Sequence, residues 1–245
     1  MKRPVAIAFA LILAAALASP AADFWETKKF TDWSEKEIER LLRNSPWAQR
    51  VDLTLRGMGG PPGMGGPGGG FPGGEGPAGA GGGIGGPGRG PVGEGGIGYE
   101  SPPTVPVYLR WMSALPVKQA VARMRFGAEA GTSQEAAQYL GREEPAYVIA
   151  VEGVPVRGLG ASFEELKARA QLRIKGREPL TPADVQGRQT KGIAEVYFFF
   201  PKEAQGGHNI TLEDKEVEFL LKLRLGDVRR KFPLKKMVYN GKLEL

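Results

Sequence analysis

The chain has 245 residues, 41% of them hydrophobic, and a formal net charge of +6 at pH 7. Its length allows one domain of ordinary size to bury a core without covalent support, and its positive charge is weaker than that of most nucleic-acid binders, so we expect no nucleic-acid partner. The absence of cysteine excludes disulfides, thiolate metal sites and cysteine catalysis.

The first segment, residues 1–22, has the three parts of a secretory signal peptide. Lys2 and Arg3 are followed by an apolar run and then by small residues, with cleavage expected after Ala18 or Ala21. The apolar run is shorter than the roughly 20 residues that cross a bilayer. We therefore expect an exported, periplasmic or extracellular protein with no stable transmembrane span. A signal that is kept as an anchor is the alternative.

A helix is expected to begin at Ser34. Ser34 and Glu37 have the spacing of a capping box, and Ile38 can form a hydrophobic staple with the preceding tryptophan. Three of the four tryptophans surround this helix: Trp25, Trp33 and Trp47. They form either an aromatic contact cluster for a ligand or, in the interpretation that we favour, anchors that fix the helix to the core.

Both ends of the mature chain carry distinctive sequences: FWETKKFTDWSEKEIERLLRNSPWA in residues 24–48 and KKMVYNGKLEL in residues 235–245. They resemble a group of uncharacterised exported bacterial proteins with an FWE...WSxKE...SPWA opening and a GKLEL-like close. The resemblance leaves out the glycine-rich part of the chain. It implies export and a shared fold, and it carries over no functional residue, because no activity is established for the group.

Residues 57–98 hold most of the 37 glycines and interrupt the rest of the chain. A segment with high backbone entropy and little apolar surface is expected to be a disordered loop. Residues 51–55 before it and 105–111 after it alternate between apolar and polar side chains, as half-buried strands do. Sequential strands are usually neighbours, so we predict an antiparallel hairpin with a very long loop. A linker between two domains is the alternative.

This interpretation divides the chain into four parts. They are a signal peptide (1–22), an N-terminal helix and first strand (23–56), a disordered Gly/Pro-rich loop (57–98) and the remainder of a single α+β domain (99–245). The second part is too short to fold alone without a disulfide. We therefore expect the pieces on either side of the loop to share one core.

Helical patterns dominate the middle of the chain. Expected helix starts are Pro116, a capping box of Thr132 and Glu135, a second box of Ser162 and Glu165, and a turn over residues 181–184. The first of these helices has an apolar stripe made of Val117, Ala120, Val121 and Met124. Residues 147–151 are apolar without interruption, which predicts a central strand that is buried on both faces.

From Ala194 onward the pattern changes to strands. Residues 195–200 and 217–223 have strand character, and the dipeptides Gly226-Asp227 and Asn240-Gly241 are expected turns between further strands. We predict that this C-terminal third is an antiparallel meander. The whole chain then predicts an α+β fold, with a mostly antiparallel sheet, helices packed on one face and an interruption by the long disordered loop.

The densest basic run lies near the C-terminus: Arg229, Arg230, Lys231, Lys235 and Lys236. It is a candidate anion-binding patch for lipid head groups or acidic polysaccharide. Strand alternation would place Arg230 on the opposite face from Arg229 and Lys231. Edge strands also carry lysines that discourage aggregation, and this protective role is the one that we favour.

No constellation of residues points to a catalytic centre, a cofactor or a metal. His208, the single histidine, has no cysteine partner and is expected to be a solvated loop residue. A carboxylate pair such as Glu152 and Glu164 could serve a hydrolase without any sequence signature. We therefore expect a non-enzymatic interaction or scaffold module, whose partner is another envelope protein or an anionic surface. An anion-binding module is the first alternative and a carboxylate-based hydrolase is the second.

Overall fold

The structure is a computed structural model that describes residues 23–55, 103–160, 162–202 and 209–245. The expected signal peptide, the glycine-rich loop and His208 lie outside these residues. Within them the fold is α+β, as predicted, and every strand pair is antiparallel.

The helices lie mostly in the first two thirds of the chain. The described α-helices are α1 (Phe24–Thr27), α2 (Glu35–Arg43), α3 (Leu115–Phe126), α4 (Gln134–Gly141), α5 (Val156–Leu159) and α6 (Phe163–Arg169). Short 3-10 helices are η1 (Phe30–Asp32), η2 (Gly127–Gly131), η3 (Leu212–Asp214) and η4 (Leu234–Lys236). No described helix is long and apolar enough to cross a bilayer.

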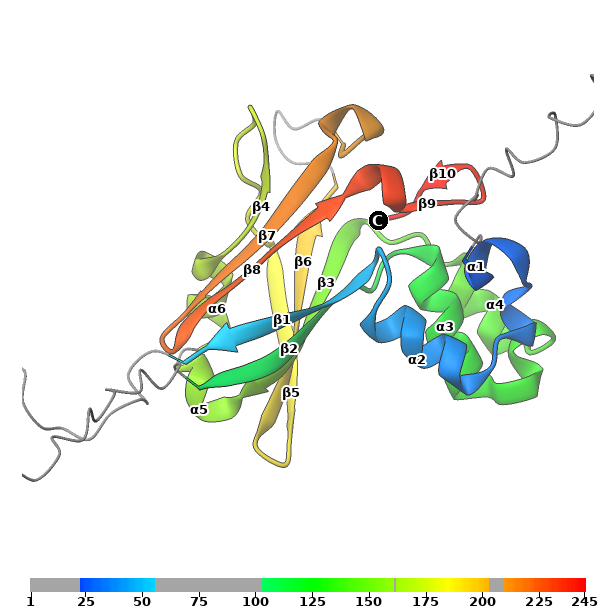
Figure 1. Cartoon of the computed structure of the whole chain (residues 1–245), viewed down its shortest axis with the longest axis horizontal. Coiled ribbons are helices and arrows are strands. Elements are labelled where there is room, and N and C mark those ends of the chain that lie inside the picture. Colours follow the sequence, from blue (N-terminus) through cyan, green and yellow to red (C-terminus); the bar gives the residue numbers. More distant parts are fainter. Residues whose placement is uncertain (1–22, 56–102, 161, 203–208) are drawn as a thin grey trace, which may run out of the picture.

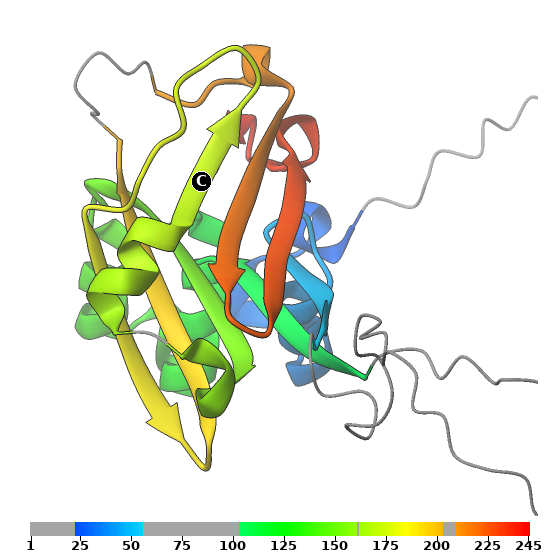
Figure 2. The same cartoon turned by 90° about the vertical axis from the view of Figure 1, so that its left-hand side faces the viewer.

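The strands form two main sheets and one short hairpin (Figure 1, Figure 2). The larger sheet has the order β1-β2-β3-β6-β5 and consists of β1 (Ala48–Thr54), β2 (Thr104–Trp111), β3 (Ala146–Pro155), β6 (Ile193–Pro201) and β5 (Asp184–Thr190). The smaller sheet contains β4 (Ala170–Ile174), β7 (Glu216–Leu223) and β8 (Gly226–Pro233) in that order, and the hairpin pairs β9 (Val238–Tyr239) with β10 (Lys242–Leu243).

The two main sheets pack against each other through large aromatic side chains. The ring centroids of Trp111 on β2 and Phe232 on β8 lie 5.7 Å apart, and those of Phe198 on β6 and Phe219 on β7 lie 5.6 Å apart. All four side chains are fully buried. Edge-to-face contacts of this kind add to the free energy of burial, so this interface is the main hydrophobic core.

The edges of the two sheets meet where β1 lies beside β8 (Figure 1). A Cβ atom on Gly226 would lie only 2.4 Å from the carbonyl oxygen of Thr54. Glycine is therefore required for this close approach of two backbones. The approach brings residues of β1 and β8, which are far apart in the sequence, onto one surface.

Helices α2, α3 and α4 gather on one side of the larger sheet, and β4, β7 and β8 lie on its other side (Figure 1). Arg110 on β2 ties the sheet to this helical layer, because its Nε donates a hydrogen bond of 2.8 Å to the carbonyl oxygen of Leu42 at the end of α2. The prediction of helices packed on one face of the sheet is confirmed for α2, α3 and α4, whereas α6 contacts β5 of the larger sheet and β7 of the smaller one.

The start of α2 is also confirmed, with Ser34 and Glu37 forming both hydrogen bonds of a capping box. Trp33 and Trp47 are fully buried, and Trp25 is 4% exposed. The indole Nε1 of Trp47 donates a hydrogen bond of 2.9 Å to the carbonyl oxygen of Glu244. The N-terminal helix, the first strand and the C-terminal hairpin are therefore docked in one core.

Predictions for the two middle helices need correction. The N-cap of α4 is Ser133 and not Thr132, because the amide of Thr132 donates to the carbonyl oxygen of Glu129 at 3.0 Å and so belongs to the preceding turn. Met124, predicted to lie in the core, is 66% exposed, since the last turn of α3 borders a groove. Lys118 is buried instead, and its Nζ donates to the carbonyl oxygen of Arg142 at 2.6 Å.

Three predictions for the later strands are also wrong. Residues 181–184 form no helical turn, because the amide of Ala183 bonds to Phe199 and leads into β5. The C-terminal third is no simple meander, since β6 belongs to the larger sheet and β7 to the smaller one. Gly226 begins β8 instead of forming the turn before it, whereas Asn240-Gly241 does connect β9 and β10.

Candidate functional site

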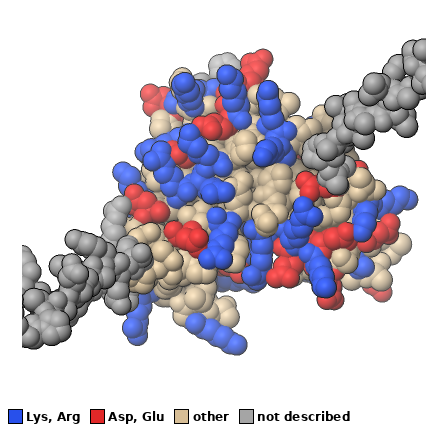
Figure 3. All heavy atoms as spheres, in the orientation of Figure 1, with Lys and Arg blue, Asp and Glu red and all other residues tan. Residues whose placement is uncertain are grey.

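A hollow with a volume of about 970 Å³ lies where α2, β1 and β8 come together. Among the described residues that line this cationic hollow, six are basic and two are acidic: Arg40, Arg43, Arg50, Arg230, Lys231 and Lys236, with Asp23 and Glu216. The space-filling view in the orientation of Figure 1 shows Lys and Arg gathered over this region (Figure 3). The hollow is therefore a surface of positive potential.

Local structure explains how these basic side chains reach one place. Arg40 and Arg43 lie in the last turn of α2, where the helix dipole favours cations. Arg50 extends from β1, and Arg230 extends from β8 next to it. The Nε of Arg230 donates to the side-chain oxygen of Gln49, a contact that joins the two strands across the sheet edge.

Four of the six cations already have an acidic partner. Ion pairs join Arg40 to Asp23 at 2.7 Å, Arg50 to Asp52 at 2.7 Å and Lys231 to Glu216 at 2.5 Å. The hydrogen bond from Lys231 to Glu216 raises the pKa of the lysine. A fourth cation, Arg43, lies 3.6 Å from Glu39. These pairs are exposed, so each contributes little to stability and leaves part of the positive field uncompensated.

The charges of Arg230 and Lys236 have no acidic partner among the described residues. Arg230 bonds only to the neutral amide of Gln49. For Lys236, the described part of the chain offers neither a hydrogen bond nor an ion pair, and both side chains belong to exposed residues. These two charges are therefore not neutralised by an acidic side chain of the described residues.

Aromatic rings hold two of the arginines in place. The guanidinium of Arg40 lies 5.5 Å from the ring centroid of Trp25, and that of Arg43 lies 5.1 Å from the ring of Tyr108. Cation–π contacts restrict the side chains to few rotamers. Less conformational entropy is then lost when a ligand binds them.

The predicted basic run is divided by the structure. Arg230, Lys231 and Lys236 line the cationic hollow, whereas Arg229 and Lys235 do not. Arg229 pairs with Glu218 of the neighbouring strand at 2.6 Å. Sequence reasoning missed Arg40, Arg43 and Arg50, because only the contact of β1 with β8 brings them to the run.

The predicted tryptophan cluster lies mainly inside the protein. The rings of Trp25 and Trp47 are 6.0 Å apart in an edge-to-face arrangement, and Trp33 packs on Phe24 at 5.6 Å. Trp25 also lines the wall of the cationic hollow. With 4% of its surface exposed at most, each tryptophan offers little area to a ligand.

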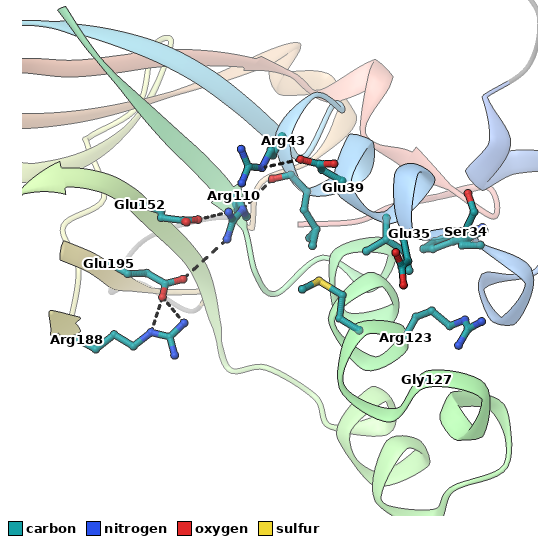
Figure 4. Close-up of a pocket in the computed structure, with 14 residues that line it drawn as sticks. Ser34, Glu35, Glu39, Arg43, Arg110, Arg123, Gly127, Glu152, Arg188 and Glu195 are labelled. Carbon is teal, nitrogen blue, oxygen red and sulfur yellow. Dashed lines mark hydrogen bonds and ion pairs between the residues drawn. The ribbon is translucent and has the colours of Figure 1, made fainter. Parts of the chain in front are cut away.

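A second hollow, of about 880 Å³, lies between α2, the end of α3 and the sheet (Figure 4). Arg110 bonds to Glu152 and lies 3.9 Å from Glu195, which in turn accepts a hydrogen bond of 2.6 Å from Nε of Arg188. Glu195 and Arg188 face each other directly on β6 and β5. Burial, followed by the hydrogen bond to Glu195, raises the pKa of nearby Tyr197 to about 12.

This network bears on the hydrolase alternative. Glu152 is held by Arg110, while Glu164 is exposed on α6 and does not line this hollow. The carboxylates that do meet, Glu152 and Glu195, share Arg110. In the described part of the chain, no group of three or more His, Asp or Glu side chains could hold a metal ion.

Comparison with known protein families, curated proteins and solved structures finds no match for this chain.

Proposed function

We propose that the mature protein is exported and acts as a non-enzymatic interaction module, which binds the carboxylate or phosphate groups of an acidic polysaccharide in the cationic hollow. The observation that carries this proposal is the position of Arg230 and Lys236. Neither has an acidic partner among the described residues, and both line the hollow together with three arginines from α2 and β1.

The shape of the site supports a polymer over a membrane surface. A flat layer of lipid head groups contacts protruding side chains, whereas these cations line a depression of about 970 Å³. The described residues with exposed large apolar side chains, such as Met124 and Leu212, do not line it. A chain of sugar carboxylates can enter such a depression and contact several cations at once.

Binding of a fluorescent polygalacturonate oligomer, measured by anisotropy at 50 mM salt, tests the proposal. The double variant Arg230→Gln/Lys236→Gln is expected to bind about tenfold more weakly, since each cation contributes about 0.5 to 1 kcal/mol at an exposed site. A matched control, Lys222→Gln/Lys235→Gln, removes the same charge from exposed positions outside the hollow and should change affinity less than twofold.

Two results would contradict this function. Equal losses in the two double variants would mean that net charge alone attracts the polymer. Binding to vesicles that contain phosphatidylglycerol, without binding to the oligomer, would assign the hollow to lipid head groups. Export is tested separately by N-terminal sequencing of the protein from fractionated cells, which should find a start at residue 19 or 22.

A further inference from the structure

The second hollow forms a groove that differs in chemistry from the cationic hollow. Its walls are α2, the last turn of α3 and the face of the larger sheet that the helices cover (Figure 4). Arg43 is the residue that the two hollows share. Acidic and basic residues are equal in number among the described lining residues: Glu35, Glu39, Glu152 and Glu195, with Arg43, Arg110, Arg123 and Arg188.

Arg123 is the exception among these arginines, because the described residues offer it no acidic partner. Its Nε atom is buried and lacks a hydrogen-bond acceptor among the described residues. The other three arginines are occupied: Arg43 with Glu39, Arg110 with Glu152, and Arg188 with Glu195. A guanidinium that no carboxylate of the protein occupies is available to the carboxylate of a ligand, and charge-assisted hydrogen bonds of this kind are about twice as strong as neutral ones.

An apolar surface lies directly beside this cation. Met124, the next residue on α3, is 66% exposed and lines the same groove. Ile38 and Leu42 of α2 line it as well. Methionine adapts to apolar groups of many shapes, so the surface suits a hydrocarbon chain or a small ring.

We propose that this groove binds a small carboxylate with an apolar body. The carboxylate accepts hydrogen bonds from the guanidinium of Arg123, and the apolar body lies along Met124 towards Ile38. Arginine offers a planar pair of donors that matches a carboxylate, and contact with the side chain of Met124 removes apolar surface from water. The volume of about 880 Å³ is ample for such a molecule.

Glu35 is the competing acceptor in this groove. It lines the groove near Arg123 (Figure 4), and the structure shows no ion pair between the two. Its negative charge opposes an incoming carboxylate. Replacement of Glu35 by glutamine is therefore expected to tighten carboxylate binding two- to fivefold.

Calorimetric titration of the full mature protein with octanoate tests the proposal, with octylammonium as the probe of opposite charge. Octanoate should bind and octylammonium should not. Arg123→Gln should weaken octanoate binding about tenfold to a hundredfold, the range expected for one hydrogen bond to a charged group, and Arg123→Lys should restore part of it. Arg125→Gln is the matched control, because Arg125 is exposed on the same helix and does not line the groove.

Several outcomes would overturn the proposal. They are the absence of octanoate binding at millimolar concentration, equal affinity for octylammonium, or equal losses in the Arg123 and Arg125 variants. If circular dichroism shows that Arg123→Gln does not fold, the Glu35→Gln variant is the remaining test. Weaker octanoate binding in that variant would refute the proposal that the groove binds a carboxylate. Because Arg230 and Lys236 are not involved, this test is independent of the polysaccharide proposal.

Discussion

Arg110→Met removes the side chain that joins the larger sheet to helix α2, so its effect on stability tests the importance of that contact. The arginine side chain is 14% exposed, and those of Glu152 and Glu195 are 35% and 12% exposed. Methionine keeps the apolar stem but removes the donors to Glu152 and to the carbonyl oxygen of Leu42. Loss of one partner from a buried ion pair costs about 3 to 5 kcal/mol, and the partial exposure of Glu152 lowers this cost to about 2 to 4 kcal/mol.

Urea denaturation at pH 7, followed by tryptophan fluorescence, measures this loss. With a typical slope of about 2 kcal/mol per M, the midpoint should fall by about 1 to 2 M. The double variant Arg110→Met/Glu152→Gln should be more stable than Arg110→Met alone by about 1 to 2 kcal/mol, because it no longer leaves a carboxylate without its partner.

The control for this experiment is Arg188→Met. Arg188 also pairs with Glu195, but its side chain is 72% exposed, so the expected loss is below about 1 kcal/mol. Equal losses in Arg110→Met and Arg188→Met would refute the assignment of Arg110 as the tie between β2 and α2. A double variant no more stable than Arg110→Met would refute the role of Glu152.

Three further changes have defined outcomes. Gly153→Ala should destabilise the protein by about 2 to 4 kcal/mol in urea melts, because Gly153 has φ +99 and an added Cβ would lie 2.7 Å from the carbonyl oxygen of Pro106. The control is Gly141→Ala, whose added Cβ meets no atom within 4 Å and which should cause no loss of stability. The hydrogen bond from Lys28 and that from the Ser34 amide lower the pKa of Glu37 from 4.5 to about 2. The stability that this carboxylate contributes at neutral pH should therefore be lost as the pH falls from about 4.5 towards 2. In Glu37→Gln, the melting temperature should not show this part of the decrease at acid pH. The pKa of Tyr197 is raised to about 12. The contribution of this tyrosine to the stability of the fold therefore persists below pH 10 and declines as the pH rises towards 12. Tyr197→Phe should remove the step at the highest pH from a titration that follows tyrosinate absorbance.

Local signals predicted the parts of the fold that local physics determines. The capping box of Ser34 and the strands β1 and β2 follow from spacing and alternation within a few residues. The strand β5 was missed because its side chains are almost all exposed, which leaves no alternation to detect. β4 was missed because it begins at Ala170 directly after α6, with no turn residue between them.

The site was only partly predictable for a different reason. Arg230, Lys231 and Lys236 stand close together in the sequence, so their run was visible. Arg40 and Arg50 come near them only because β1 lies beside β8, a strand about 180 residues further on, as the contact of Arg230 with Gln49 shows. Tertiary contacts of that range leave no periodic signal in one sequence. Likewise, Met124 fits an apolar stripe, and only the groove beside α3 explains its exposure.

The salt dependence of polygalacturonate binding tests the central claim most directly. Displacement of counterions by the cations of the hollow predicts that wild-type affinity falls at least about tenfold between 50 and 200 mM salt. It also predicts that the slope of log affinity against log salt becomes shallower by about 1 to 2 in Arg230→Gln/Lys236→Gln and stays unchanged in Lys222→Gln/Lys235→Gln. Identical slopes in the wild type and both variants would show that the cationic hollow does not hold the anion.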